Sequence, residues 1–378
     1  MNQLGHIMHH NSKKRLCVLM QGHWSRVMGG SQYQAKCIIE ELNKTGKYDI
    51  VFLTRDHRPD YRPKGYRLVQ YGYPGAHKRG FHRIPFEMVT LPRALRKIDP
   101  DIIYQRVGCA QTGISAHYAR KNNCKMVWHI AHDSDLERHQ LKLSRFIIYR
   151  WLERKLLNYG IKHATQIIAQ TEDQKAMLEK NFKRSPTEVI PNFHPLPTET
   201  VEKRYPVKVA WVANLKIMKQ PEIFIRLADE MKNAANVQFL MIGEMQGSKP
   251  AKQRYAKMIE NVQNLRYLGG QSQEVVNATL AESHIFVNTS LQEGFPNTFI
   301  QAWLRKVPVV SLHVDPDKLI ERYKIGFVAG SIEKLREKVS MLVSDDELRE
   351  HMGNNAKTFA NRHFSPNNAI RIYKLLEG

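Results

Sequence analysis

A carboxylate, a glycine and a helix start follow one another at residues 293–297. Glu293 is a hydrogen-bond acceptor able to hold sugar hydroxyls, and Gly294 lets the backbone approach a ligand closely. Pro296 and Asn297 have helix-start chemistry, because proline pre-sets φ and asparagine caps. The helix expected over 298–306 would present unpaired N–H groups and a positive dipole end, which suits a phosphate. The same residues fit a plain capping arrangement, so the pattern alone leaves both interpretations open.

Short apolar runs alternate with helical patterns along the whole chain, which predicts parallel sheets covered on both faces. A helix is expected over Ser31–Leu42, and three prolines within 190–197 predict a linker. We therefore expect an α/β fold of two doubly wound Rossmann-like domains, 1–195 and 196–378, facing a central cleft at the carboxyl ends of their strands. The predicted strands are Leu16–Met20, Ile50–Leu53, Ile102–Tyr104, Lys125–Trp128, Gln166–Ala169, Val207–Val212, Val237–Ile242, Ile285–Val287 and Pro308–Ser311.

The charge of the chain is strongly basic. Its 378 residues include 58 Lys and Arg against 36 Asp and Glu, a formal net charge of +22. Such a field attracts nucleic acid, an anionic membrane face or a phosphorylated substrate. Nucleic acid is disfavoured, because the sequence has no zinc-finger spacing, aromatic RNA-binding signature or basic-zipper heptads. We therefore favour a function in which the chain binds a membrane surface or an anionic substrate. The alternative is a basic surface that is only solvated.

The compartment expected from the sequence is the cytoplasm. No apolar run approaches the ~18 residues of a membrane-spanning helix, no signal-like apolar region follows the N-terminus, and the four cysteines form no C-x-x-C pair. The segment 141–161 is amphipathic and basic, so it could lie on a membrane interface. We favour packing of Phe146, Ile147, Trp151 and Leu152 into the domain core.

The run FVNTSLQEGFPNTFIQAWLRKVPVVS, residues 286–311, resembles the donor-site signature of family 4 glycosyltransferases of the GT-B fold. In that family two glutamates eight positions apart contact the transferred sugar and the nucleotide ribose. Glu293 matches the first, but Gln301 stands at the second, where its amide would make an uncharged and weaker bond. The resemblance implies that the neighbouring donor-binding residues are Gly294, Phe295, Pro296 and Asn297.

The segment 212–221 is similar to the donor-diphosphate loop of the same family. Lys219 matches the lysine that binds the pyrophosphate, which the resemblance makes catalytic together with Glu293. Asn214 stands where many members have arginine, and Lys216 is the candidate second cation. Two further segments resemble the nucleotide side of the site, and they contain Gly243 and Leu268.

In the first half, Gly29 and Gly30 before a helix resemble the family's glycine loop, which faces the donor across the cleft. A histidine at a strand end lies beside the sugar and acceptor in this family. His132 is the best match and the third catalytic candidate; Asp133 beside it and His129 are acceptor-side candidates.

The resemblance covers the chain from Leu16 to its last helix and implies a retaining glycosyltransferase. Its donor would be a nucleotide-diphospho-sugar, and its acceptor a glycan or lipid-linked oligosaccharide in surface polysaccharide biosynthesis. The first domain would take the acceptor and the second the donor, with the last helix crossing back. Peripheral contact with the anionic inner face of the cytoplasmic membrane would fit the charge. No cofactor and no metal are expected, since cationic side chains and a helix dipole neutralise the leaving diphosphate in this family.

Other functions fit parts of the sequence. A non-hydrolysing sugar-nucleotide epimerase shares the two-domain architecture, and a non-catalytic binder of anionic polymers would account for the charge. A D-x-D metal site at Asp133–Asp135 has little weight, because the same pattern occurs at 99–101 and 315–317. A dehydrogenase is disfavoured, because no G-x-G-x-x-G follows a strand. Arg106, at a strand end, is a further candidate for the cleft.

Overall fold

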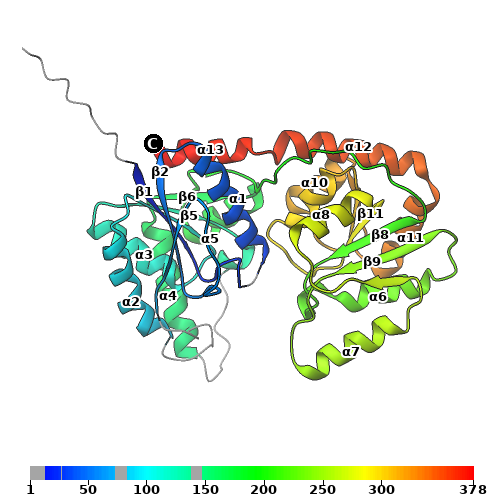
Figure 1. The fold of residues 1–378 in the computed structure, drawn as a ribbon, viewed down its shortest axis with the longest axis horizontal. Coiled ribbons are helices and arrows are strands. Elements are labelled where there is room, and N and C mark those ends of the chain that lie inside the picture. Colours follow the sequence, from blue (N-terminus) through cyan, green and yellow to red (C-terminus); the bar gives the residue numbers. More distant parts are fainter. Residues whose placement is uncertain (1–12, 27, 73–82, 138–146) are drawn as a thin grey trace, which may run out of the picture.

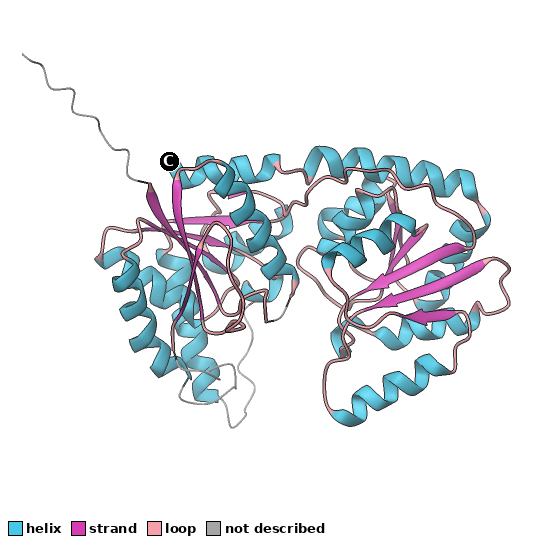
Figure 2. Ribbon diagram, viewed as in Figure 1, coloured by secondary structure: helices cyan, strands magenta, loops and turns pink. Residues whose placement is uncertain are grey.

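Two parallel sheets, one in each half of the chain, form the framework of the computed structural model (Figures 1 and 2). The structure describes residues 13–26, 28–72, 83–137 and 147–378. The first sheet has the order β3-β2-β1-β4-β5-β6-β7 and the second the order β10-β9-β8-β11-β12-β13. The strands are β1 (Lys14–Met20), β2 (Tyr48–Thr54), β3 (Arg67–Gln70), β4 (Ile102–Arg106), β5 (Lys125–His129), β6 (Gln166–Ala169), β7 (Glu188–Val189), β8 (Val207–Val212), β9 (Val237–Ile242), β10 (Leu265–Tyr267), β11 (Ile285–Asn288), β12 (Val309–Ser311) and β13 (Gly326–Val328).

Helices lie on both faces of each sheet, as the near-continuous apolar strands require. The predicted α/β class with two doubly wound domains is therefore confirmed. The helices are α1 (Gly30–Lys44), α2 (Arg83–Ile98), α3 (Ala110–Lys121), α4 (Ile147–His163), α5 (Glu172–Phe182), α6 (Pro221–Glu230), α7 (Lys249–Glu260), α8 (Gln273–Glu282), α9 (Asn297–Trp303), α10 (Leu319–Arg322), α11 (Ile332–Ser344), α12 (Asp346–His363) and α13 (Asn367–Glu377).

Each sheet reverses its strand order once, between β1 and β4 in the first and between β8 and β11 in the second. Such a reversal leaves a crevice outside the carboxyl ends of the strands, where ligands of α/β proteins bind. The loops after these four strands therefore determine what the molecule can hold.

Helices α12 and α13 run along one side of both domains (Figure 1). Helix α13 ends against the first sheet: Arg371 pairs with Glu188 at 2.7 Å, and the Tyr48 hydroxyl donates to Glu377 at 2.5 Å. The chain thus crosses between the domains twice, through the segment after β7 and again through α12 and α13. No helix in the described ranges is both long and apolar enough to cross a membrane.

Helix α4 packs differently from our expectation. Trp151 is 49% exposed and Leu152 only half-buried, whereas Leu157 and Ile161 of the same helix lie in the core. The last two turns meet α3 so closely that a Cβ on Gly160 would lie 2.6 Å from the backbone of Thr112. The predicted core role of Trp151 is wrong, because the contact with α3 is made by the C-terminal half of the helix. Phe146 and the side chain of Ile147 lie outside the described residues.

Candidate active site

A cavity of about 490 Å³ lies between the two domains at the carboxyl ends of both sheets. Its walls include the end of β4 and the loops that follow β1, β5, β6 and β7 in the first domain, and the loops that follow β8, β9 and β11 in the second. Thirteen of the sixteen predicted site residues line it: Gly29, Gly30, His132, Asn214, Lys216, Lys219, Gly243, Glu293, Gly294, Phe295, Pro296, Asn297 and Gln301.

Lys219 and Glu293 form a direct ion pair in this cavity, between Nζ and Oε1, although 74 residues separate them in sequence. A 3₁₀ turn, Ile217–Lys219, carries the lysine, and the Thr289 hydroxyl donates to the Lys219 carbonyl at 2.7 Å. The Ser290 hydroxyl donates to Glu293 Oε1 at 2.8 Å. Both charged side chains are therefore held by the loop after β11.

Besides Arg26, which pairs with Asp56 at 3.3 Å, two more cations border the same cavity. Lys216 is an exposed residue, and partial desolvation of its ammonium group together with the neighbouring Lys219 lowers its pKa. Arg106 is 2% exposed; its guanidinium donates to Asn192 Oδ1 at 2.9 Å and forms no ion pair with any described carboxylate. Positive charge beside Lys219 favours a ligand with more than one negative charge.

The loop before α9 touches the first domain. A Cβ on Gly294 would lie 2.9 Å from the Ala131 carbonyl oxygen, and a Cβ on Gly30 would lie 2.6 Å from Asn297 Nδ2. Glycine at both positions thus permits the close approach of the two domains.

Asn297 does not cap α9, contrary to our expectation. It is the first helical residue, Pro296 precedes it without a side-chain cap, and the helix ends at Trp303, so it is shorter than the predicted 298–306. Its Oδ1 instead accepts a hydrogen bond of 2.9 Å from Gln34 of α1. The asparagine ties the two domains together, because Gln34 belongs to the first domain and Asn297 to the second.

Gln301 lines the cavity with its amide oxygen available. Its Nε2 donates to Gln273 Oε1 at 3.0 Å and to Asn277 Oδ1 at 2.8 Å, both on α8. Helix α8 therefore fixes the orientation of this side chain, which leaves Oε1 as the atom able to accept from a ligand hydroxyl.

His132 follows β5 and lines the cavity on the first domain's side. Burial lowers its pKa, and Arg106, Lys219 and Lys216 add to the lowering while Glu293 opposes it. The imidazole is therefore neutral near pH 7, so it can exchange hydrogen bonds with a substrate without adding charge.

Three predicted site residues lie outside the cavity wall. His129 is 1% exposed, and its Nδ1 lies 2.6 Å from the Tyr104 hydroxyl. Asp133 accepts from Gln174 Nε2 at 3.0 Å, and Leu268 N donates to the Met241 carbonyl. These residues are close in sequence to residues of the cavity wall, but their side chains point elsewhere. Only the direction of a side chain decides whether it faces the cavity.

Several wall residues had no signal in the sequence. Arg26, Gln170, Asn192, Gln271 and Gln273 line the cavity from five separate loops and helices. A lone arginine, glutamine or asparagine forms no motif in the sequence, so only the fold brings these five residues together.

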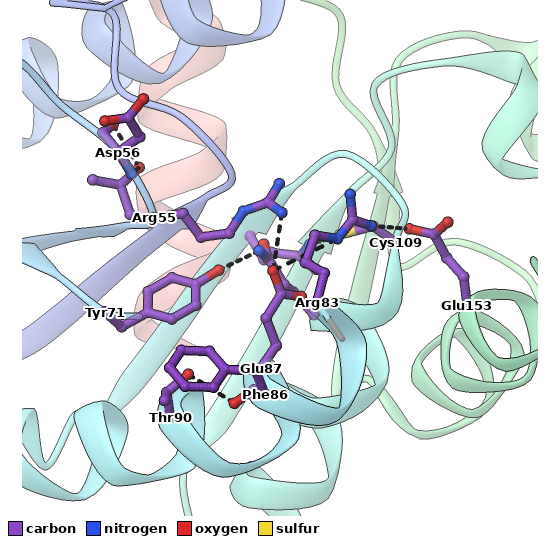
Figure 3. Close-up of polar contacts among 12 residues, drawn as sticks. Arg55, Asp56, Tyr71, Arg83, Phe86, Glu87, Thr90, Cys109 and Glu153 are labelled. Carbon is purple, nitrogen blue, oxygen red and sulfur yellow. Dashed lines mark hydrogen bonds and ion pairs between the residues drawn. The ribbon is translucent and has the colours of Figure 1, made fainter. Parts of the chain in front are cut away.

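A second polar cluster lies at the same end of the first sheet (Figure 3). Arg55, just after β2, pairs with Glu87 of α2 at 3.0 Å, and Arg83 pairs with Glu153 of α4 at 2.8 Å. Burial raises the pKa of Glu87, while the two arginines lower it. The Arg55–Glu87 pair is nearly solvent-free, so it fixes α2 to the end of β2 rather than offering a free charge.

Comparison with known proteins identifies the family. Residues 28–196 match the family described as Glycosyltransferase Family 4, and residues 198–359 match Glycosyl transferases group 1. The chain belongs to the family 4 glycosyltransferases of the GT-B fold. The two matches meet between β7 and β8, so each family segment corresponds to one of the two sheets.

Other solved structures share this fold over nearly their whole length. WaaG, a glycosyltransferase involved in lipopolysaccharide biosynthesis, superposes with a TM-score of 0.75 at 13% identity, covering 96% of this chain and 100% of WaaG. Anabaena HepE in complex with UDP-glucose gives 0.73 at 15% identity, covering 96% and 99%. A curated relative, the uncharacterized glycosyltransferase MJ1059 of Methanocaldococcus jannaschii, is 24% identical over 249 residues. That match spans 58% of this chain and 57% of the relative's length.

Proposed function

We propose that this family 4 glycosyltransferase transfers a sugar from a nucleotide-diphospho-sugar to a glycan or lipid-linked acceptor, with retention of anomeric configuration. The observation that carries the proposal is that Lys219 and Glu293 meet in one cavity between the domains. Proteins of similar structure support it, since HepE binds UDP-glucose and WaaG takes part in lipopolysaccharide biosynthesis.

In the proposed complex, the diphosphate takes the place of Glu293 as the partner of Lys219. Lys216 provides a second positive charge beside the diphosphate. Glu293, released from the lysine, accepts hydrogen bonds from sugar hydroxyls. The ion pair thus holds both side chains in position before the donor arrives, so little reorganisation is needed at the moment of reaction.

The reaction breaks the bond between sugar C1 and the β-phosphate oxygen. The acceptor oxygen forms the new bond to C1 on the same face, and the acceptor's hydroxyl proton passes to the departing phosphate. Negative charge accumulates on that phosphate as C1 becomes oxocarbenium-like, and Lys219 stabilises it. Neutral His132 lies on the first domain's side, where it orients the sugar and the incoming hydroxyl through hydrogen bonds. No group outside the substrates and these side chains takes part in the proposed steps, so we propose no cofactor.

The test is a donor screen followed by a transfer assay. Thermal shifts with UDP-, GDP- and ADP-sugars identify the donor, because a ligand at 100 times its Kd adds about 2.7 kcal/mol to folding stability. Incubation of that donor with and without glycan or lipid-linked acceptors then shows acceptor-dependent release of nucleoside diphosphate. If no sugar nucleotide shifts the melting temperature, the proposal fails.

Two controls separate the alternatives. An epimerase would convert the donor with no acceptor present, which NMR of the donor incubated with the protein reveals. A binder of anionic polymers would show steeply salt-dependent affinity for nucleic acid and no response to sugar nucleotides.

We further propose that the protein works at the inner face of the cytoplasmic membrane, through the surface formed by α2 and α4. Exposed apolar side chains on these helices lie among exposed basic ones. They are Phe86, Met88, Val89, Ile148 and Trp151, with Arg93, Arg96, Lys97, Arg150 and Lys155. Such a surface suits anionic lipid headgroups and the upper acyl region. Co-sedimentation with vesicles containing phosphatidylglycerol should exceed that with phosphatidylcholine alone and should fall for Trp151→Gln; equal sedimentation would refute this part.

A further inference from the structure

A second cavity, of about 370 Å³, lies in the C-terminal domain at the far end of α9 from the donor cavity. It is bounded by the segment 197–205 that leads into β8, by the residues around the C-terminal end of α8, by the residues just after α9 and by α12. Both chain crossings between the domains therefore border it.

Four cationic side chains line this cavity without an acidic partner. Within the described ranges, Lys203, Arg305, Lys306 and Lys357 form no ion pair, and each is half-buried. Lys203 Nζ donates to the Lys306 carbonyl at 2.8 Å, so its ammonium is held in place by a neutral group. Half-buried cations lacking carboxylates lose part of their hydration without recovering it in a salt bridge.

Two buried groups complete the polar wall. Arg349 is 9% exposed, donates to the Leu342 carbonyl at 2.6 Å and pairs with Asp346. His284 is 5% exposed and accepts from the Lys208 backbone N–H at 3.1 Å, and burial lowers its pKa to about 4.

The acidic residues of the wall do not balance this charge. Asp346 is already paired with Arg349 and also accepts from the Tyr205 hydroxyl. Glu199 and Glu350 are exposed and form no ion pair with a described cation. Burial lowers the pKa of Lys203 to about 7, and the nearby Arg349 and Lys306 add to the lowering.

Apolar side chains close the rest of the wall, among them Pro197, Val201 and Leu304. The volume lies within the range of small-molecule sites, roughly 300–1,000 Å³, and leaves no room for a polymer. A compact anion with a small carbon body matches both the charge and the lining.

We propose that this cavity is a second ligand site, which binds a small phosphomonoester through Lys203 and Lys357. A phosphate carries up to two negative charges and three acceptor oxygens, enough to pair with several cations at once. The ligand would lie next to Arg305, whose Nη1 donates to the carbonyl of Gln301 at 3.0 Å. The site would thus share α9 with the donor cavity while remaining separate from it.

The experiment is calorimetric titration of the 378-residue chain with glycerol 3-phosphate, and with glycerol as the uncharged comparison. Five proteins are compared: wild type, Lys203→Met, Lys357→Met, Lys219→Met and Lys334→Met. Lys219→Met removes the phosphate-binding lysine of the donor cavity, and Lys334 is an exposed lysine on α11 that matches the charge change. Melting temperatures without ligand verify folding, and Lys357→Met carries the test should Lys203→Met fail to fold.

The proposal predicts that wild type, Lys219→Met and Lys334→Met bind glycerol 3-phosphate alike, with affinity falling about tenfold or more in Lys203→Met and Lys357→Met. Glycerol should not bind. No heat of binding in wild type up to about 10 mM would overturn the proposal. It would also be overturned by loss of binding in Lys219→Met alone, or by unchanged affinity in Lys203→Met and Lys357→Met.

Discussion

The carboxylate of Glu293 is the ion-pair partner of Lys219 in the structure, and both lie in the cavity between the domains. The pair brings the loop after β8 against the loop after β11, at the point where the strand order of the second sheet reverses. The Thr289 hydroxyl holds the Lys219 carbonyl and the Ser290 hydroxyl holds the Glu293 carboxylate, so the loop after β11 positions the proposed partners of both the phosphate and the sugar.

Replacement of Lys219 by methionine should slow sugar transfer by roughly 10²-fold or more, because one well-placed donor to the developing charge is worth about 3 kcal/mol. The loss should lie in kcat, since the lysine acts most strongly on the departing phosphate. Steady-state kinetics of nucleoside diphosphate release measure it. Lys257→Met, an exposed position on α7, is the matched control, and equal turnover in both variants would remove Lys219 from the mechanism.

Glu293→Gln should abolish most sugar transfer while leaving the fold intact. The amide keeps the size of the side chain, but it loses the charge-assisted bonds to sugar hydroxyls, which are about twice as strong as neutral ones. Transfer assays and a melting curve measure the two effects. Donor-sugar kinetics equal to those of wild type would exclude the proposed role.

Gln301→Glu should strengthen binding of the nucleoside diphosphate by about three- to tenfold, because a carboxylate accepts from ribose hydroxyls more strongly than an amide. The amides of Gln273 and Asn277, which now accept from Gln301, can turn to donate to the new carboxylate. Calorimetric titration measures the change. An unchanged or weaker affinity would mean that this side chain does not contact the ribose.

His194 should make the protein sensitive to acid. It is 2% exposed beside Tyr33 at the domain junction, and burial lowers its pKa to about 3. Because its unfolded pKa is near 6.5, the unfolded state binds the extra proton first, so stability is lost as pH falls below 6.5. The loss continues down to pH 3 at about 1.4 kcal/mol per pH unit.

His194→Gln should remove this dependence, so the stability difference between variant and wild type should shift in the variant's favour as pH falls from 7 to 5. Urea unfolding at several pH values measures it. The comparison cancels the opposite contribution of Asp135, whose pKa burial raises to about 7. Parallel pH profiles would show that folding does not lower the pKa of His194.

Glu87→Gln should destabilise the first domain by about 3 kcal/mol, because it leaves Arg55 buried without its counter-charge. Chemical unfolding measures the loss. A loss within 0.5 kcal/mol, typical of surface changes, would show that Arg55 finds water or another partner.

The fold and much of the site follow from sequence because their signals are local. Alternating apolar strands and helices predict both sheets, and the 286–311 run places Glu293 beside the helix it precedes. The short strands β3, β7, β10 and β13 are not predicted in this way, since two to four residues of mixed polarity at a sheet edge have no clear period. The bridge from Gln34 to Asn297 also escapes, because it depends on how two domains meet.

The direct test of the account is calorimetric titration of the nucleoside diphosphate selected by the donor screen into wild type, Lys219→Met and Glu293→Gln. We predict that Lys219→Met binds about tenfold or more weakly, and that Glu293→Gln binds at least as tightly as wild type because its lysine is freed for the phosphate. Wild-type affinity in Lys219→Met, or equal weakening in both variants, would contradict the assignment of the phosphate to the lysine and the sugar to the glutamate.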